Sequence, residues 1–293
     1  MLIASNAEEI VRKELPLMHS WYHVASSSEL KNGQIITKKL CNTEVVIYRT
    51  KAGDIRAIDP YCPHLGAHLG HGGRIVGESI ECPFHGWQFD VAGKCTTIPY
   101  SEFPAPKRGC LKHKHVREFM GLIMVWFHPE GKGPSFGLDF DNELLDGNWS
   151  KSTLNSYIFD GYIQELVENI IDVGHFPKIH KYDKLPTITE CSVNGHILTA
   201  GVHTIANRLK FFEIDTELRA QFSGCGLSCA VVTVANRWRL LVVAGSTPQE
   251  TGKLKSTFTI RYERSKNPLS NLVGRFLMAF FEDDFLNGNP PER

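Results

Sequence analysis

Apolar and polar residues are arranged in short, regularly interrupted segments along the first part of the chain. β-Branched and aromatic residues occur in short runs, and glycine, asparagine and aspartate occupy the intervals between them. Such runs predict short strands joined by turns. We therefore expect a short N-terminal segment, 1–20, followed by a small all-β domain over residues 21–129. The predicted strand segments are 33–40, 43–50, 54–60, 79–90, 94–100 and 119–129.

The pattern changes after residue 129. Residues 130–150 are rich in glycine, aspartate and asparagine, which is typical of a connector. In 162–176 apolar residues recur with the period of an amphipathic helix, which Pro177 should end. A second domain over 151–293, with a sheet flanked by helices, makes the predicted fold class α+β. Its expected strands are 187–193, 196–206, 230–247 and 253–264, and its expected last helix is 271–286.

The balance of basic and acidic residues bears on whether the chain binds nucleic acid. The chain has 293 residues, with 32 Lys and Arg against 32 Asp and Glu. Without a basic excess we expect no nucleic-acid partner. No apolar run reaches the ~18 residues of a transmembrane helix, and the acidic N-terminus does not resemble a signal peptide. We therefore expect a cytoplasmic protein whose eight cysteines are reduced thiols or metal ligands.

Two similar motifs interrupt the strands of the first domain. Cys62 and His64 lie in "YCPHLGAHLG", and Cys82 and His85 lie in "ECPFHGWQFD", giving the spacing C-x-H-x17-C-x2-H. Two thiolates and two imidazoles on glycine-flanked loops are suitable ligands for zinc or for an iron–sulfur cluster. Each loop supplies one Cys and one His. This mixture favours a [2Fe-2S] cluster in which one iron binds both sulfurs and the other binds both nitrogens.

Two other interpretations of these loops are a zinc site and a disulfide. A zinc site usually pairs like ligands in each loop, and a Cys62–Cys82 disulfide would leave two surface histidines. His68 and His71 are nearby alternatives as ligands, but both fall outside the spacing. We interpret them as loop residues.

The segment 61–100, "YCPHLGAHLGHGGRIVGESIECPFHGWQFDVAGKCTTIPY", resembles the Rieske domain of Rieske non-haem iron oxygenases. It is most similar to the branch that contains cholesterol 7-desaturases and 3-ketosteroid hydroxylases. The resemblance implies a catalytic domain with a curved antiparallel sheet of the helix-grip, START-like type. It also implies a homotrimer and an NAD(P)H-dependent reductase partner of the flavin or ferredoxin type.

A second motif, "ENIIDVGHFPKIH", follows in the predicted helix. Asp172 and His175 are three positions apart, so on a helix they would share one face, and His180 would fold back after Pro177. Two histidines and one carboxylate form the facial triad that binds Fe(II) and leaves positions open for dioxygen. Alone, two histidines at this spacing would more often simply face solvent. The oxygenase family has the motif N-x-x-D-x-x-H-x4-H here. Asn169, Asp172, His175 and His180 match it position by position.

The third iron ligand is expected near the C-terminus, in "FFEDDFL". Helical periodicity places Leu272, Val273, Phe276 and Phe280 on an apolar face, with Asp283 and Asp284 on either side of its centre. Periodicity therefore does not choose between the two aspartates. The family pattern, an acid followed three residues later by an aliphatic residue, favours Asp283 with Leu286. Asn287 departs from this pattern, because the family often has an aromatic residue there. An acidic helix end that simply meets solvent is the alternative.

These motifs give one leading function and several alternatives. The resemblance implies a terminal oxygenase that uses the cluster and Fe(II) to activate dioxygen. Cys62, His64, Cys82 and His85 would hold the cluster, and His175, His180 and Asp283 would hold the iron. In the family an aspartate at the position of Asp172 connects the two centres across a subunit interface. Asp172 could instead only orient His175.

The substrate rests on the resemblance alone. It implies hydroxylation or desaturation of a bulky apolar, sterol-like molecule. The alternative is N-oxygenation or oxidative demethylation of an aromatic or alkaloid-like molecule. A stand-alone Rieske electron carrier with a lipid-binding domain is a third possibility, and a zinc-stabilised interaction module is a fourth.

Overall fold

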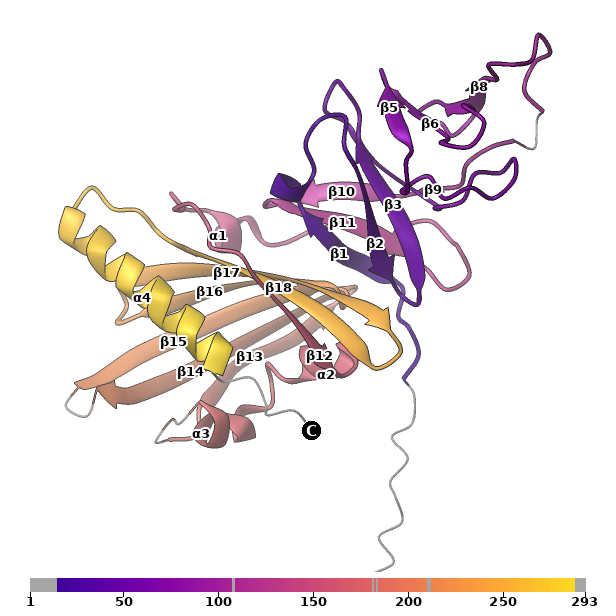
Figure 1. Cartoon of the computed structure of the whole chain (residues 1–293). Helices are drawn as coiled ribbons and strands as arrows, with labels where there is room; N and C mark the ends of the chain where they lie inside the picture. The colour runs from indigo at the N-terminus through magenta and orange to yellow at the C-terminus, as the bar shows by residue number, and fades with distance from the viewer. Residues whose placement is uncertain (1–14, 107–108, 181, 183, 210–211, 288–293) are drawn as a thin grey trace, which may run out of the picture.

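The structure of the chain is a computed structural model that describes residues 15–106, 109–180, 182, 184–209 and 212–287. Side chains are described except at 206–209, 212–213 and 284–287. Short antiparallel strands form the N-terminal part, and one long antiparallel sheet with a helix across it forms the C-terminal part (Figure 1). The predicted α+β class, with an all-β first part, is confirmed.

Three small antiparallel sheets make up the N-terminal part. Their orders are β1-β11-β10, β2-β3-β4-β9 and β5-β6-β7-β8, with a short 3₁₀ helix η1 (Ser27–Glu29) after β1. The strands are β1 (Ser20–Ser26), β2 (Ile35–Leu40), β3 (Thr43–Arg49), β4 (Ile55–Ile58), β5 (Arg74–Val76), β6 (Ser79–Glu81), β7 (Gln88–Phe89), β8 (Cys95–Thr97), β9 (His113–Lys114), β10 (Val116–Phe119) and β11 (Leu122–Phe127).

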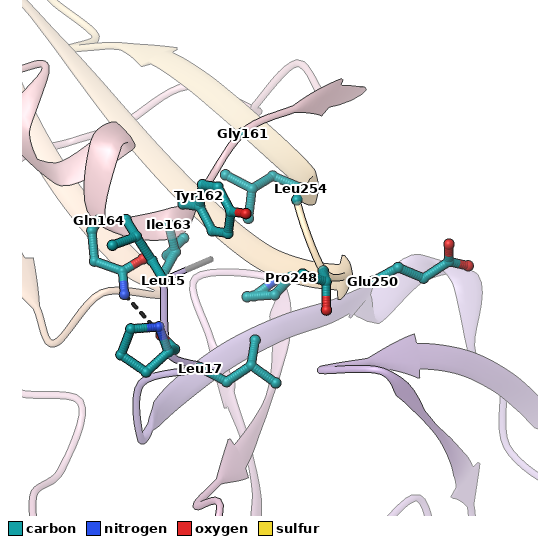
Figure 2. Close-up of a pocket in the computed structure, with 12 residues that line it drawn as sticks. Leu15, Leu17, Gly161, Tyr162, Ile163, Gln164, Pro248, Glu250 and Leu254 are labelled. Atoms are coloured by element: carbon teal, nitrogen blue, oxygen red, sulfur yellow. Dashed lines mark hydrogen bonds between the residues drawn. The ribbon is translucent and has the colours of Figure 1, made fainter. Parts of the chain in front are cut away.

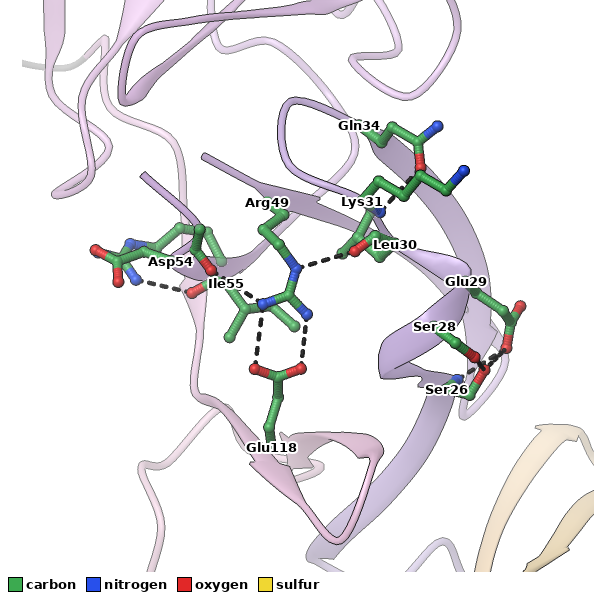
Figure 3. A network of polar contacts seen from close by, with 12 residues as sticks. Ser26, Ser28, Glu29, Leu30, Lys31, Gln34, Arg49, Asp54, Ile55 and Glu118 are labelled. Atoms are coloured by element: carbon green, nitrogen blue, oxygen red, sulfur yellow. Dashed lines mark hydrogen bonds and ion pairs between the residues drawn. The ribbon is translucent and has the colours of Figure 1, made fainter. Parts of the chain in front are cut away.

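A polar network joins two of these sheets (Figure 3). The Arg49 guanidinium on β3 donates to both carboxylate oxygens of Glu118 on β10, at 2.6 and 3.2 Å. It also donates to the backbone oxygens of Leu30 and Gly53. A bidentate arginine–carboxylate pair has fixed geometry as well as charge attraction. The Glu118 contact holds the pKa of Arg49 above its usual value and that of Glu118 below its usual value.

The C-terminal part is a seven-stranded antiparallel sheet in the order β12-β18-β17-β16-β15-β14-β13. Helix α4 (Pro268–Asn287) crosses one face over β17 and β18 (Figure 1). The other elements are α1 (Asn142–Leu145), β12 (Asn155–Asp160), α2 (Ile163–Glu168), the 3₁₀ helix η2 (Val173–His175), α3 (Phe176–Ile179), β13 (Thr187–Asn194), β14 (Ile197–Leu209), β15 (Phe212–Ser223), β16 (Leu227–Val234), β17 (Trp238–Glu250) and β18 (Lys253–Tyr262).

The two parts share a hydrophobic core. Leu122, Met124 and Trp126 of β11 pack with residues of β16 and β17, while Ile123 and Val125 face the core of the N-terminal part. Strand β11 is therefore covered on both faces, which explains its uninterrupted apolar sequence. The expected connector 130–150 also packs in the shared core, through Phe136, Leu138, Phe140, Leu144 and Trp149.

Gly245 of β17 permits the close approach of β1. A Cβ atom at this position would lie 2.5 Å from the Cβ of His23. That separation is shorter than van der Waals contact, so a larger residue would force the two sheets apart. His23 itself is only 2 % exposed.

Three expectations about individual elements are wrong. The segment 230–247 is a hairpin, because Ala235 and Asn236 both adopt positive φ (50°) and turn the chain between β16 and β17. Positive φ at both turn residues matches the twist of the flanking strands. The helix expected over 162–176 ends at Glu168, and Pro177 lies in the first turn of α3, where a missing N–H costs nothing.

The third correction concerns α4. The residues that pack on the sheet are Val273, Leu277, Met278 and Phe281, whereas Leu272, Phe276 and Phe280 are exposed. Periodicity identified an apolar face but not the one that contacts the sheet. Within the described ranges, no helix has the length and apolar character needed to cross a bilayer.

Candidate functional site: two metal-binding motifs

The two Cys/His loops share one backbone arrangement. In the first, the Cys62 N–H donates to the Ala67 oxygen and the Gly66 N–H donates to the Cys62 oxygen, both at 2.9 Å. In the second, the Cys82 N–H donates to the Trp87 oxygen at 2.9 Å and the Gly86 N–H to the Cys82 oxygen at 3.1 Å. Both glycines have positive φ, 74° and 70°, which only glycine adopts readily.

The structure brings the four predicted cluster ligands together as two pairs. The Cys62 and Cys82 thiols are neighbours and are 3 % and 2 % exposed. The His64 and His85 rings lie 4.7 Å apart, centroid to centroid. Burial, and then the neighbouring Cys82 thiol, raise the pKa of Cys62 to about 11. A bound cation would be needed to hold the Cys62 thiol as a thiolate at neutral pH.

One buried atom tests whether these residues fit a cluster. The Nδ1 atom of His64 is buried and has no hydrogen-bond partner in the described structure. A buried polar atom without a partner is rare in proteins, because it loses its hydrogen bonds to water. Coordination to iron would satisfy this nitrogen, and it matches a site in which one iron takes two imidazoles. The donor set and this atom both fit a [2Fe-2S] cluster.

Trp87 is a further residue of this site that the Cys/His spacing did not identify. Its ring is stacked on His64 at a centroid separation of 4.4 Å and an interplanar angle of 8°. Its Nε1–H donates to the Tyr100 hydroxyl at 2.8 Å. Trp87 therefore fixes the plane of the His64 ring. Its position two residues after His85 was the available signal.

His68 is engaged elsewhere. Its Nδ1 accepts a hydrogen bond from the Gly70 N–H at 3.0 Å, and its Nε2 lies 3.3 Å from the Glu44 carboxylate. Both ring nitrogens thus have neighbours other than the four predicted cluster ligands. This arrangement agrees with the interpretation of His68 as a loop residue.

The second motif is a turn rather than one helical face. Asn169 is exposed and ends α2, and its N–H donates to the Glu165 oxygen. Asp172 is the N-cap of η2, and its carboxylate accepts a hydrogen bond from the Gly174 N–H at 3.2 Å. Asp172 and His175 are therefore close because of this turn. The expectation that they share a helix face is wrong.

The turn orients His175. The His175 Nδ1 bonds to the backbone oxygen of Asp172, and the Asp172 carboxylate is 3.8 Å from the same nitrogen. With Nδ1 engaged, Nε2 is the nitrogen left for a metal. The His175 and His180 rings are 5.3 Å apart, at an angle of 60°. This pair of imidazoles fits two ligands of a mononuclear iron.

The predicted carboxylate ligand is not assembled with these histidines. No three His, Cys, Asp or Glu side chains converge as on a single metal ion within the part of the chain that the structure describes. Asp283 is exposed near the end of α4, and the side chain of Asp284 lies outside the described residues. The preceding residue, Glu282, accepts a hydrogen bond from Asn155 of β12.

A cavity of about 190 Å³ lies beside α2, the helix that leads into the second motif (Figure 2). Its walls are Leu15–Leu17, the start of α2 at Gly161–Gln164, and the turn between β17 and β18. The Gln164 side chain donates to the Pro16 oxygen at 2.8 Å. Pockets for ligands of drug size are commonly 300–1,000 Å³. We therefore do not assign this cavity to a bulky substrate.

Known proteins share parts of this sequence. The cholesterol 7-desaturase nvd of Xenopus laevis is 36% identical over 173 residues, which are 58% of this chain and 38% of that protein. The oxygenase component of the 3-ketosteroid-9-alpha-monooxygenase of Rhodococcus rhodochrous is 31% identical over 186 residues, which are 62% of this chain and 48% of that protein. The chain thus spans less than half the length of these relatives.

Solved structures share the fold. Dicamba monooxygenase bound to 3,6-dichlorosalicylic acid has a TM-score of 0.68 and 19% identity, covering 94% of this chain and 91% of that chain. NdmA of Pseudomonas putida CBB5 with caffeine has a TM-score of 0.68 and 20% identity, covering 93% and 83%. At this identity the likeness shows the fold alone.

Two family models match the chain. The model of the Rieske [2Fe-2S] domain matches residues 20–108, which include both Cys/His loops. The model of the 3-ketosteroid 9α-hydroxylase C-terminal domain matches residues 125–287, more than half of the chain. The chain belongs to the Rieske non-haem iron oxygenases, in the branch that includes the 3-ketosteroid 9α-hydroxylases.

Proposed function

We propose that the chain is a terminal oxygenase that hydroxylates or desaturates a bulky, apolar, sterol-like molecule. The observation that carries the proposal is the pair of matched Cys/His loops, together with the buried, unpartnered Nδ1 of His64 in the first loop. When bound, the cluster and a mononuclear iron would supply electron transfer and dioxygen activation. The protein holds and orients these groups through its own residues.

In this proposal His175, His180 and Asp283 hold the iron, with Asp284 as the alternative carboxylate. The engaged Nδ1 of His175 supports the assignment, because a metal-binding imidazole usually bonds its second nitrogen to a carbonyl or carboxylate. Asn169 would lie near the iron. The domain division would be a Rieske domain at 21–129 and a catalytic domain at 151–293, after an N-terminal segment and a connector.

The electron path would cross a subunit interface. The Asp172 side chain is 65 % exposed while its backbone oxygen is bonded to His175. An exposed carboxylate that is fixed to an iron ligand is suited to meet a histidine of a neighbouring subunit. This supports Asp172 as the bridge in a homotrimer. An NAD(P)H-dependent reductase of the flavin or ferredoxin type would supply the electrons, since a relative is named as an oxygenase component.

The second candidate is oxidative demethylation or N-oxygenation of an aromatic or alkaloid-like molecule. It is favoured by the fold shared with dicamba monooxygenase and with NdmA bound to caffeine. Sterol chemistry ranks higher because the sequence relatives at 31–36% identity are named for cholesterol and a ketosteroid.

The test combines metal analysis with a substrate screen. Purified protein should contain iron in excess of the two irons of its [2Fe-2S] cluster, whereas an electron carrier should contain those two alone. With a surrogate reductase, NADH and dioxygen, mass spectrometry should detect an oxidised or desaturated sterol. Products from arylamine or N-methyl substrates alone would establish the second candidate. Cluster iron alone, without turnover, would reject the oxygenase.

A further inference from the structure

Helix α4 is apolar on two neighbouring sides. Its inner side packs on the sheet through Val273, Leu277, Met278 and Phe281. Its outer side has a second apolar row, which we call the outer stripe: Leu269, Leu272, Phe276 and Phe280. These side chains are 67 %, 62 %, 61 % and 37 % exposed. The spacing of three, four and four residues places them on one face of the helix.

An ordinary surface helix has polar residues on the side away from the core. Here the sheet covers the inner side, and Leu269, Leu272 and Phe276 are largely exposed in the described chain. Contiguous exposed apolar patches usually mark contacts with proteins, membranes or ligands. Helix α4 lies across one face of the sheet (Figure 1), and Leu269, Leu272 and Phe276 are not among the residues that pack on it.

The charged residues near the two ends of the outer stripe differ in sign. Arg264 and Lys266, just before the helix, and Arg275, within it, are exposed around the first half of the stripe. Glu282 and Asp283 lie at the far end. An apolar row of Leu and Phe flanked by Lys and Arg is the pattern of helices that lie in the interface of an anionic bilayer. The acidic end would be repelled by such a surface.

We propose that the first half of the outer stripe, Leu269 to Phe276, docks on an anionic lipid bilayer. The apolar side chains would enter the boundary between headgroups and acyl chains, while the three cations contact lipid phosphates. The inference deepens the proposed function, because a sterol-like substrate dissolves in bilayers and not in water. Lipid binding itself requires neither metal nor turnover, so the two proposals fail separately.

The test is flotation of the full chain with vesicles of phosphatidylcholine mixed with phosphatidylglycerol. Wild-type protein should float with these vesicles, less with phosphatidylcholine alone, and less at high salt because the attraction is screened. The double variant Leu272→Ser/Phe276→Ser should bind at least about tenfold more weakly, since two apolar side chains are lost. Arg264→Gln/Lys266→Gln should reduce the preference for the anionic vesicles.

Matched control variants replace an exposed apolar residue and an exposed cation that lie outside α4. Val193→Ser removes a 72 % exposed apolar residue, and Lys94→Gln removes an exposed cation of the N-terminal part. Both should bind vesicles like the wild type. All substituted side chains are exposed, so folding, checked by circular dichroism, should be unchanged.

Three results would overturn the proposal. The first is wild-type protein that does not float. The second is a stripe variant that floats as well as the wild type. The third is a stripe variant that dissociates an oligomer in analytical ultracentrifugation without changing vesicle binding, which would assign the stripe to a second copy of the chain. A loss of turnover on sterols with unchanged flotation would concern only the proposed function.

Discussion

His64 is a buried imidazole whose Nδ1 has no partner in the described structure and whose ring is held by Trp87. If it binds iron, replacing it with cysteine should keep the cluster but lower its reduction potential, because thiolate stabilises the oxidised state more than imidazole does. Potentiometric titration followed by electron paramagnetic resonance measures the change in His64→Cys and His85→Cys.

His68→Cys is the matched control, since His68 lies in the same loop but contacts Gly70 and Glu44. Its potential should stay close to that of the wild type. An unchanged potential in His64→Cys would show that His64 is not a ligand.

The buried His23 predicts that the free energy of unfolding decreases at acidic pH. Burial lowers its pKa from 6.5 to about 4, with Lys255 and Lys38 acting in the same direction and Glu29 opposing them. The unfolded chain therefore binds this proton at a higher pH than the folded chain does. His23 therefore leaves the free energy of unfolding unchanged above pH ~6.5 and lowers it as the pH falls toward ~4. At pH 5 the loss amounts to about 2 kcal/mol.

Urea unfolding at several pH values checks this effect. His23→Leu should remove this part of the acid destabilisation, so the wild type should lose about 2 kcal/mol more than the variant between pH 7.5 and pH 5. His115→Leu changes an exposed histidine and should follow the wild type. Parallel pH profiles for wild type and His23→Leu would contradict the lowered pKa.

Single elements show where sequence reasoning succeeds and where it stops. The Cys/His loops were predictable because each is local and its glycines fix the turn. The turn at Ala235 and Asn236 was missed, although Asn is a common turn residue, because Ala is not one and the flanking residues form an apolar run. Strand β15 was not expected, although Ile214, Thr216 and Leu218 alternate with charged residues and carry the strand signal.

Helix α4 shows the limit imposed by long-range packing. Its sequence has two apolar sides, and only the sheet decides which one is buried. For the same reason the sequence alone did not choose between Asp283 and Asp284. A carboxylate ligand far along the chain from its histidines depends on how the helix docks, which periodicity does not encode.

The choice of carboxylate gives an element-level prediction. His175→Ala, His180→Ala and Asp283→Ala should each lose the mononuclear iron and turnover while the visible spectrum of the cluster is kept. Asp284→Ala should lose much less iron. Iron analysis with the visible spectrum measures both. An iron-free Asp284→Ala beside an iron-replete Asp283→Ala would assign the ligand to Asp284.

The whole-molecule prediction concerns electron transfer between subunits. A His64→Ala chain should lack the cluster and a His175→Ala chain should lack the iron, so each should be inactive alone. If the chain forms a ring of head-to-tail subunits, co-assembled chains should regain partial turnover, because a cluster then faces the iron of its neighbour. Asp172→Asn on the iron-competent chain should abolish this rescue.

The control for this experiment is a mixture of separately assembled oligomers, which should show no rescue. Mixed oligomers of verified composition that remain inactive would leave Asp172 with only the orientation of His175, through the bonds seen in the structure.

The core shared by β11, β16 and β17 determines whether the N-terminal and C-terminal parts can be separated. A cut after residue 129 would separate Trp21, Leu122 and Trp126 from Leu227, Leu241 and Val243, and would leave both fragments with apolar surface in water. Each part should therefore be less stable alone than in the whole chain. Engineers who exchange the N-terminal part between homologues would have to transplant both sides of this core together.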